Sequence, residues 1–591
     1  MEELYDLIKT YRTRLKGECD KLATEAFDKL VEQSGVDVAA NRALAREEAK
    51  AQKHLKKMQA RSGWLIFGII CTILLCGGGI GYFFTLFPEQ YLGEDLQLYQ
   101  IGGTILLGLL ALFCLMPLIS SFRDTRKQIA EVEAKIKELH DRGWQQMAPL
   151  NKLFTWHTVT DIIGKVMPQT KFDPYFTSGR LEQLREQFGW DDSFNDNRSV
   201  IACQSGSVIG NPFVLAHVFS TEMGTKTYHG YLTIHWTATE TYRDSKGRMC
   251  TRRVTRSQRL HATVEKPAPY YYDKRFLIYG SEAAPNLSFS RDPNEMSDDG
   301  DNWFARFKMR RAIKKMRKKS MQEGSSFMMM SNEEFDALFN AHNRTDEAEF
   351  RLLFTPVAQR QMVALLRDYK VGYGDDFKFL KVNKINLIDA QHLQTLDVDA
   401  NPENFRYWNL EEMRKFFISF VNNYFRAFYF AFAPIFSIPL YQQYKSDAEI
   451  YKDVYDHKGS FWEYESLANA YGQDAFKAPN SITQNILKIS NTSNNRDGST
   501  TLKVTAYGFR GVKHVDYVTK FGGDGKHHEV PVEWIEYIPV EKTSPLTVRE
   551  NPPSQEEEDV AQSDDWKSFF EQWKNCDNKA RALRRFIYSY R

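Results

Sequence analysis

The chain reads WLIFGIICTILLCGGGIGYFFTLF from Trp64 to Phe87 and IGGTILLGLLALFCLMPLISS from Ile101 to Ser121. Neither stretch contains a charged residue, and each reaches the roughly 20 residues that a helix needs to cross the hydrocarbon of a bilayer. A buried helix of a soluble core normally keeps a polar stripe, which both stretches lack. The sequence therefore predicts a two-span membrane hairpin over 63–122, with spans at 64–87 and 101–121.

Flanking charges predict the orientation of this hairpin. Lys57 and Arg61 precede the first span, Arg123 and Arg126 follow the second, and the loop between the spans carries acidic residues without Lys or Arg. Under the positive-inside rule, both termini lie in the cytoplasm. Neither span contains an ionisable residue of the kind that marks ion or proton pathways.

Length and composition exclude several classes of protein. The 591 residues are too many for one core and predict about four structural units. Lys and Arg total 78 against 76 for Asp and Glu, which excludes a globally basic nucleic-acid-binding chain. The seven cysteines include no CxxC pair. They therefore predict neither a disulfide framework nor a zinc knuckle, and they indicate a reducing compartment.

Apolar residues at spacings of three and four continue the hairpin on both sides. They predict N-terminal cytoplasmic helices over 1–62 and a helical stalk and linker over 123–196, both coiled-coil-like. These helices would pack with each other or across a homo-oligomer. Gly77 and Gly81 form a GxxxG spacing inside the first span, which serves packing within the hairpin or between copies.

Alternating hydrophobicity predicts two β-rich units, at 197–291 and 446–546. In the first, RSVIACQSGSVIG, YLTIHWTATETY, RSQRLHATV and KRFLIYG are expected to be separate strands. In the second, TLKVTAYGF, VKHVDYVTKF and VPVEWIEYIPV are expected to be strands, with GGDGKHH as a hairpin turn.

Helix signals fill the block between these units, at 331–445. Ser331 and Asn409 are expected helix caps, and Pro356 an expected helix start. The fold class is therefore α+β: an N-terminal membrane helical hairpin with coiled-coil-like extensions, then a cytoplasmic body of two β-rich units with helices between them.

A third uncharged run, AFYFAFAPIFSIPLY at 427–441, raises the question of a further span. It contains two prolines and is shorter than a span, so we expect a buried or interfacial helix over 424–441. A third span remains the alternative.

The insertion at 292–330 is acidic and then basic. Its RFKMRRAIKKMRKK segment predicts a basic amphipathic helix, which at a cytoplasmic leaflet favours contact with anionic lipid. Nucleic-acid binding and a solvated insertion neutralised by its acidic neighbour are the alternatives. The candidate lipid-contacting residues are Arg306, Lys308, Arg310, Arg311, Lys314, Lys315, Arg317, Lys318 and Lys319.

The C-terminal region is expected to hold an acidic Pro/Glu linker at 547–562 and an amphipathic helix at 563–591. An aromatic stripe would dock this helix on the body, on a protein partner or on the bilayer. The candidate docking residues are Trp566, Phe569, Phe570, Trp573, Leu583 and Ile587.

Signatures of catalysis and of cofactor or metal binding are not found in the sequence. His229 and His235 share a strand pattern but lie about 20 Å apart at strand rise, too far to bind one ion. The GGDGKHH turn lacks the spacing of a phosphate-binding loop. We assign no catalytic, cofactor-binding or metal residues, and an enzyme is unsupported.

Three segments resemble uncharacterised bacterial membrane proteins of the domain-of-unknown-function type. They are FDALFNAHNRTDEAEFRLLFTPVAQRQMVALLRDY, YFRAFYFAFAPIFSIPLYQQY and KPAPYYYDKRFLIYGSEAAPNLSFSRDP. The resemblance implies two N-terminal transmembrane helices and a large cytoplasmic α+β domain in the bacterial inner membrane. It brings no known activity and no functional residues.

Together these features predict a membrane-anchored cytoplasmic binding or scaffold protein of a bacterial inner membrane. Its expected partners are the lipid bilayer, anionic lipid, further copies of the chain and a protein partner, whereas nucleic acid is not favoured. A membrane-tethered enzyme with a pocket between the β-rich units is the first alternative. A pore of oligomerised hairpins is the second.

Overall fold

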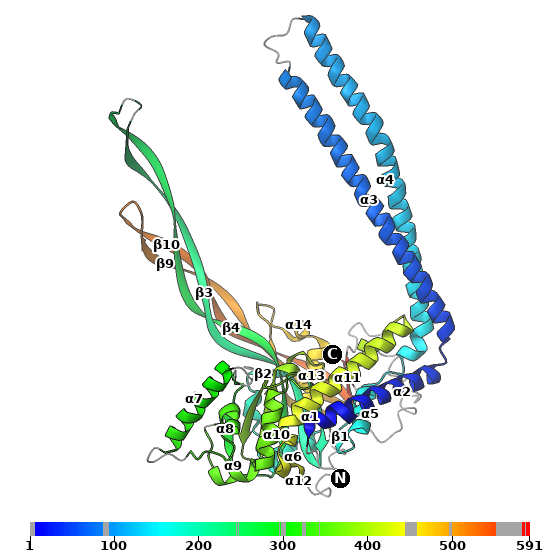
Figure 1. The fold of residues 1–591 in the computed structure, drawn as a ribbon, viewed down its shortest axis with the longest axis vertical. Coiled ribbons are helices and arrows are strands. Elements are labelled where there is room, and N and C mark those ends of the chain that lie inside the picture. Colours follow the sequence, from blue (N-terminus) through cyan, green and yellow to red (C-terminus); the bar gives the residue numbers. More distant parts are fainter. Residues whose placement is uncertain are drawn as a thin grey trace. The chain divides into compact units, whose positions relative to one another are not determined.

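The computed structural model describes most of the chain. The described residues are 6–86, 94–243, 245, 247–294, 296, 303–321, 327–341, 343–443, 458–495, 499–550, 582–584 and 587–590. The fold mixes helix and sheet, with 49% of residues helical and 31% in strands (Figure 1). The chain divides into two compact units, which we call the body unit (1–22, 156–401 and 421–591) and the stalk unit (23–155 and 402–420).

Two long helices form most of the stalk unit. α3 spans Val38–Leu86 and α4 spans Glu94–Asn151, and they lie side by side (Figure 1). Each is long and apolar enough to cross a membrane, and only 11% and 6% of their most apolar stretches are buried. The predicted spans fall inside these two helices, except that Phe87 lies outside the described residues.

Hydrogen bonds tie both helices of the stalk unit to one short segment, 407–410. The Asn41 side chain of α3 donates to the carbonyl of Trp408 at 2.9 Å and accepts from the backbone N–H of Leu410 at 3.0 Å. At the end of α4, the Asn151 side chain accepts from the N–H of Tyr407 at 3.2 Å. Two buried asparagines thereby satisfy backbone groups that packing would otherwise leave unpaired.

The larger sheet of the body unit has seven strands in the order β1-β2-β3-β4-β7-β6-β5, and all its pairings are antiparallel. The strands are β1 (Thr170–Phe172), β2 (Arg198–Val208), β3 (Asn211–Arg243), β4 (Met249–Gly280), β5 (Ser288–Arg291), β6 (Phe377–Val382) and β7 (Ile385–Ala390).

Two expectations about this sheet are wrong. The block at 331–445 is not wholly helical, because it supplies β6 and β7. RSQRLHATV and KRFLIYG are not separate strands but parts of the single strand β4. Pro267 and Pro269 lie between them and would interrupt a central strand, but here β4 pairs only with β3, so its other edge needs no N–H donor.

The second sheet has the order β11-β12-β10-β9-β8. Its strands are β8 (Ile486–Asn494), β9 (Thr500–Phe521), β10 (His527–Glu550), β11 (Ala582–Arg584) and β12 (Ile587–Tyr590). The predicted GGDGKHH turn does join β9 to β10.

The C-terminal expectations are partly wrong. Residues 547–550 belong to β10 and not to a linker. Leu583 lies in β11 and Ile587 in β12 rather than on a helix, because β12 adds to the free edge of β10 and satisfies its backbone groups. Trp566, Phe569, Phe570 and Trp573 lie outside the described residues.

The remaining α-helices belong partly to the body unit and partly to the stalk unit. They are α1 (Leu7–Thr10), α2 (Lys16–Ser34), α5 (Thr158–Val166), α6 (Ser178–Glu186), α7 (Trp303–Ser320), α8 (Glu333–Phe339), α9 (Glu347–Leu353), α10 (Pro356–Arg367), α11 (Leu410–Phe436), α12 (Pro439–Gln443), α13 (Phe461–Tyr471) and α14 (Gln473–Phe476). Pro356 begins α10 and the Asn409 side chain caps α11, as predicted. The cap of α8 is Asn332, not Ser331.

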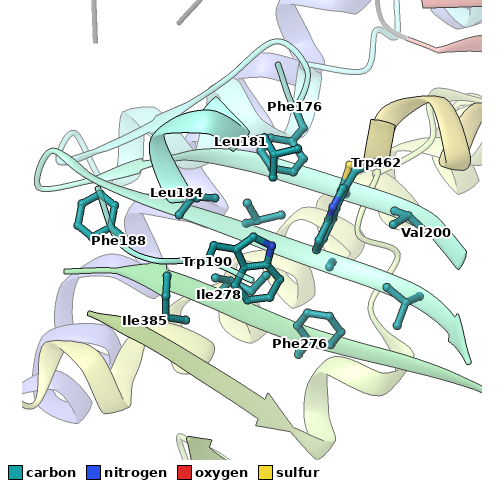
Figure 2. Packing of buried hydrophobic residues seen from close by; sticks show 14 residues of the cluster. Phe176, Leu181, Leu184, Phe188, Trp190, Val200, Phe276, Ile278, Ile385 and Trp462 are labelled. Atoms are coloured by element: carbon teal, nitrogen blue, oxygen red, sulfur yellow. The ribbon is translucent and has the colours of Figure 1, made fainter. Parts of the chain in front are cut away.

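Within the body unit the large sheet is covered on both faces. On one face, Trp462 of α13 and Leu184 of α6 pack with Val200, Phe276 and other buried residues of the strands (Figure 2). On the other, Phe428 and Phe432 of α11 contact Phe213 of β3, with ring centroids 5.8 and 5.2 Å apart.

The uncharged run at 427–441 is accordingly buried against the sheet, with Phe432 and Phe436 at most 1% exposed. The expectation of a buried helix is confirmed for this run. The N-terminal stripe packs here as well: the Tyr11 ring stacks on Phe425, and the hydroxyl of Tyr429 donates to the carbonyl of Leu7 at 2.9 Å.

A fully buried ion pair joins β5 to the segment that precedes β6. Arg291 donates to Asp375 at 2.5 Å and to the carbonyls of Phe339 and Phe377, and both charged side chains are 0% exposed. The other oxygen of Asp375 accepts from the N–H of Asn294 at 2.9 Å. Each charge is thus compensated within the fold. Removal of either partner would leave the other charge buried without a counter-charge.

We expect Asp375→Asn to lower the free energy of unfolding by about 3–5 kcal/mol, because it leaves the Arg291 guanidinium buried without a counter-charge. Asp292→Asn is the matched control, since Asp292 and its partner Lys378 are 70% and 60% exposed, and it should cost about 0–1 kcal/mol. Denaturant unfolding of the detergent-solubilised chain measures both. Equal losses for the two variants would contradict the assignment.

Candidate functional site

The most distinctive surface of the body unit is a long two-stranded ribbon. β3 and β4 pair residue for residue out to Arg243 and Met249, whereas the pairing of β2 with β3 extends only to Ser220. We call the two-stranded part, Thr221–Tyr271, the β arm (Figure 1). At about 3.3 Å per residue it reaches roughly 75 Å from the sheet.

The β9–β10 hairpin covers one face of the β arm. Ile234 and Leu260 of the arm pack with Val530 and Val532 of β10 in a buried cluster. The approach is close at Gly230, where a Cβ atom would lie 2.1 Å from the Pro531 carbonyl oxygen. This packing supplies the hydrophobic face that a two-stranded ribbon needs for stability in water.

The opposite face of the β arm is uncovered. Because side chains alternate along both strands, every second residue lies on this face. Its described residues from Thr221 to Tyr271 are mostly exposed, with threonine the commonest, and the face carries Arg243, Arg253 and Arg259 against the carboxylate of Glu265. The guanidinium of Arg259 lies 4.0 Å from the ring centroid of Tyr231. The uncovered face is therefore hydroxyl-rich and carries more arginines than carboxylates.

Two histidines lie together on this face. Nδ1 of His229 is 3.0 Å from Nε2 of His261, and the His261 ring also stacks on Tyr231. His235 shares the face, as expected, but not the cluster. Among the described residues, no group of three or more His, Cys, Asp and Glu side chains could hold a metal ion.

Beyond the β9–β10 hairpin, the β arm is free on both faces. The hairpin ends where the N–H of Gly523 donates to the Gln258 side chain at 2.6 Å and where Gly523 approaches Trp236. We call the part beyond, Thr237–Thr255, the arm tip. Its exposed apolar side chains are Tyr242 and Met249, at 47% and 66%.

One carboxylate in the arm tip is already neutralised. Glu240 accepts from Arg256 at 2.8 Å and from Arg252 at 3.2 Å, and these hydrogen bonds, the first more than the second, lower the pKa of Glu240. Arg243 and Arg253 point to the other face and are exposed. The tip therefore keeps an excess of positive charge.

The β arm is the candidate site feature that the sequence analysis did not predict. Its signal is the alternation of threonine with larger side chains on both sides of the RDSKGR turn. Read locally, that pattern predicts strands but not their unbroken pairing across the turn.

The predicted basic helix is present as α7, but its apolar face is covered. Met309, Ile313 and Met316 pack with Phe327 and Ala337 in one cluster. Arg317 is paired with Glu333 at 2.7 Å. The basic residues that α7 exposes are Lys308, Arg310, Arg311, Lys314, Lys315, Arg317 and Lys318, while the side chains of Arg306 and Lys319 are not described.

A cavity of about 460 Å³ lies between the two sheets, at the base of the β arm. Its ionisable side chains are Asp196, Tyr271, Tyr507 and Glu541. The hydroxyl of Tyr271 donates to Thr483 at 3.1 Å, and burial raises its pKa. The lining holds these carboxylates and tyrosine hydroxyls and no His, Cys or Lys.

Two strongly shifted side chains lie elsewhere, inside the protein core. Burial raises the pKa of Glu465 to about 7, although Lys488 lies 3.0 Å away. Burial lowers the pKa of Lys381 to about 7, and its Nζ donates to the carbonyl of Ala283 at 3.1 Å. Neither side chain lines the cavity between the sheets, so their shifts bear on stability.

The pair formed by His392 and Asp376 looks like part of a catalytic triad. Nδ1 of His392 is 2.6 Å from the carboxylate, but Nε2 faces the carbonyl of Ala427 at 3.1 Å. With both ring nitrogens engaged, the histidine is held as a link between elements.

Comparisons with family models, with curated proteins and with solved structures each give no match. The case for a function therefore rests on the geometry of the β arm and the apolar helices.

The Lys381→Met variant tests the shifted lysine. Because the pKa of Lys381 falls from 10.5 unfolded to about 7 folded, its contribution to stability is present above pH 10.5 and is lost as the pH falls toward 7. The stability of the wild type relative to the variant should therefore drop by up to about 1.4 kcal/mol per pH unit in that window.

Urea unfolding between pH 7 and 9.5 measures this difference. Leu380→Met, on the neighbouring residue of β6, is the uncharged control and should show no slope. A flat difference for Lys381→Met would disprove the shift.

Proposed function

We propose that this chain is a membrane-anchored binding or scaffold protein that presents the β arm to a partner. The observation that carries the proposal is the uncovered, positively charged face of a ribbon about 75 Å long. A ribbon of that length adds little to the core, because only one of its faces is buried. An exposed surface built at such a distance is typical of recognition at a site that the body does not reach.

The exposed apolar helices support the membrane part of the proposal. Leu74 of α3 and Phe113 of α4 are 67% and 81% exposed, as are many of their apolar neighbours. A soluble protein rarely exposes a continuous apolar surface of this extent. We infer an inner membrane with both termini in the cytoplasm from the charges that flank the spans. Contact of α7 with anionic lipid would then use its basic face alone.

We expect the double variant Leu74→Arg, Phe113→Arg to disrupt membrane insertion. An arginine at the centre of a span costs about 2.5–3.5 kcal/mol, whereas the same change would be harmless on a water-exposed helix. Carbonate extraction of membranes measures the fraction that stays inserted. Gln52→Arg, earlier on α3, is the control. Wild-type retention of the double variant would contradict the proposed anchor.

The binding role is tested by shortening the β arm. Trp236 and Arg256 are cross-strand partners, so replacing 237–255 by Asn-Gly closes the ribbon with a two-residue turn and keeps its register. The melting temperature should stay unchanged, since the packed cluster with β10 is retained. Partners recovered by cross-linking and affinity purification from membranes should be lost.

The control for that experiment is Thr519→Ala, a change at an exposed position of β9 outside the β arm. It should keep both stability and partner recovery. Full partner recovery with the shortened arm would refute a binding role for the tip.

A further inference from the structure

We propose that the arm tip binds the surface of an anionic phospholipid bilayer, a proposal that rests on the β arm being a binding device. Two observations carry it: the excess of arginine over carboxylate and the pair of exposed apolar side chains that flank the turn. Together they match a surface with phosphates outside and hydrocarbon beneath.

The charge of the tip is the first argument. The sequence of 237–255 contains Arg243, Lys246, Arg248, Arg252 and Arg253 against Glu240 and Asp244. Arginine dominates, and its planar guanidinium donates two parallel hydrogen bonds to a phosphate. Each arginine that lies within a Debye length of an anionic leaflet adds to the attraction between the tip and the membrane.

The apolar residues at the end of the arm are the second argument. Tyr242 lies at the end of β3 and Met249 is the first residue of β4. They point to opposite faces of the ribbon, because one is an even and the other an odd position. An end-on approach would bring both into the interface, where tyrosine is enriched.

The test uses the full chain in nanodiscs of neutral phosphatidylcholine, mixed with separate sucrose-loaded vesicles. We expect wild-type discs to co-sediment with vesicles containing phosphatidylglycerol and not with neutral vesicles. Arg243→Gln with Arg253→Gln should lower the partition coefficient roughly 30-fold. Tyr242→Ser with Met249→Ser should lower it at high salt, where charge attraction is screened.

Lys503→Gln with Arg510→Gln is the control for total charge, since both residues are exposed on β9 away from the tip. It should bind like the wild type. The double variant Arg310→Gln, Arg311→Gln measures how much of the vesicle binding is due to α7.

Equal binding to neutral and anionic vesicles, or unchanged binding by the tip variants, would overturn the lipid assignment. Tighter binding of the discs to a duplex DNA or RNA fragment, lost in the arginine variant, would replace lipid by nucleic acid. If the tip variants keep vesicle binding while the shortened arm still loses a protein partner, the lipid proposal fails and the binding role of the β arm stands.

Discussion

Burial of one face of the β3–β4 ribbon against the β9–β10 hairpin is the interaction on which the rest of the β arm depends. Two strands alone in water are marginal, because half of their side chains have nothing to pack on. The cluster of Ile234, Leu260, Val530 and Val532 supplies that packing. By covering one face only, it also decides which side chains are structural and which are available to a partner.

The same strands behave differently along their length. Near Phe213 the sheet is sandwiched between α11 and the α6–α13 side, so both faces of β3 are apolar and buried. Past Ser220 the strand loses β2 and keeps a single covered face, and the burial pattern changes to alternation. One continuous strand therefore belongs first to a core and then to an arm.

Much of the fold follows from local sequence signals. Uninterrupted apolar runs predicted the two long helices, and the cap at Asn409 and the proline at 356 predicted the starts of α11 and α10. The pairing of β7 with β4 could not be predicted, because it joins segments more than a hundred residues apart in the chain. Likewise, β12 becomes a strand because the edge of β10 is free, which the aromatic stripe of its own sequence does not reveal.

In the candidate site, too, some features can be predicted from local sequence and others depend on strand pairing. The charges of α7 are adjacent in sequence and easily found, yet its apolar face is used inside the protein. The arginines of the β arm are diluted among threonines and gather only when β3 pairs with β4.

The unbroken pairing of these strands also constrains how the protein can evolve. Losing one residue from β3 before Ile234 would turn every side chain beyond it to the other face, so His235 would take the place of Ile234 in the apolar cluster. Insertions and deletions in the arm are therefore tolerated in matched pairs on both strands, each pair changing its length by about 7 Å. Lineages of this protein should carry arms of stepwise different lengths, with the reach of each adjusted without disturbing the body.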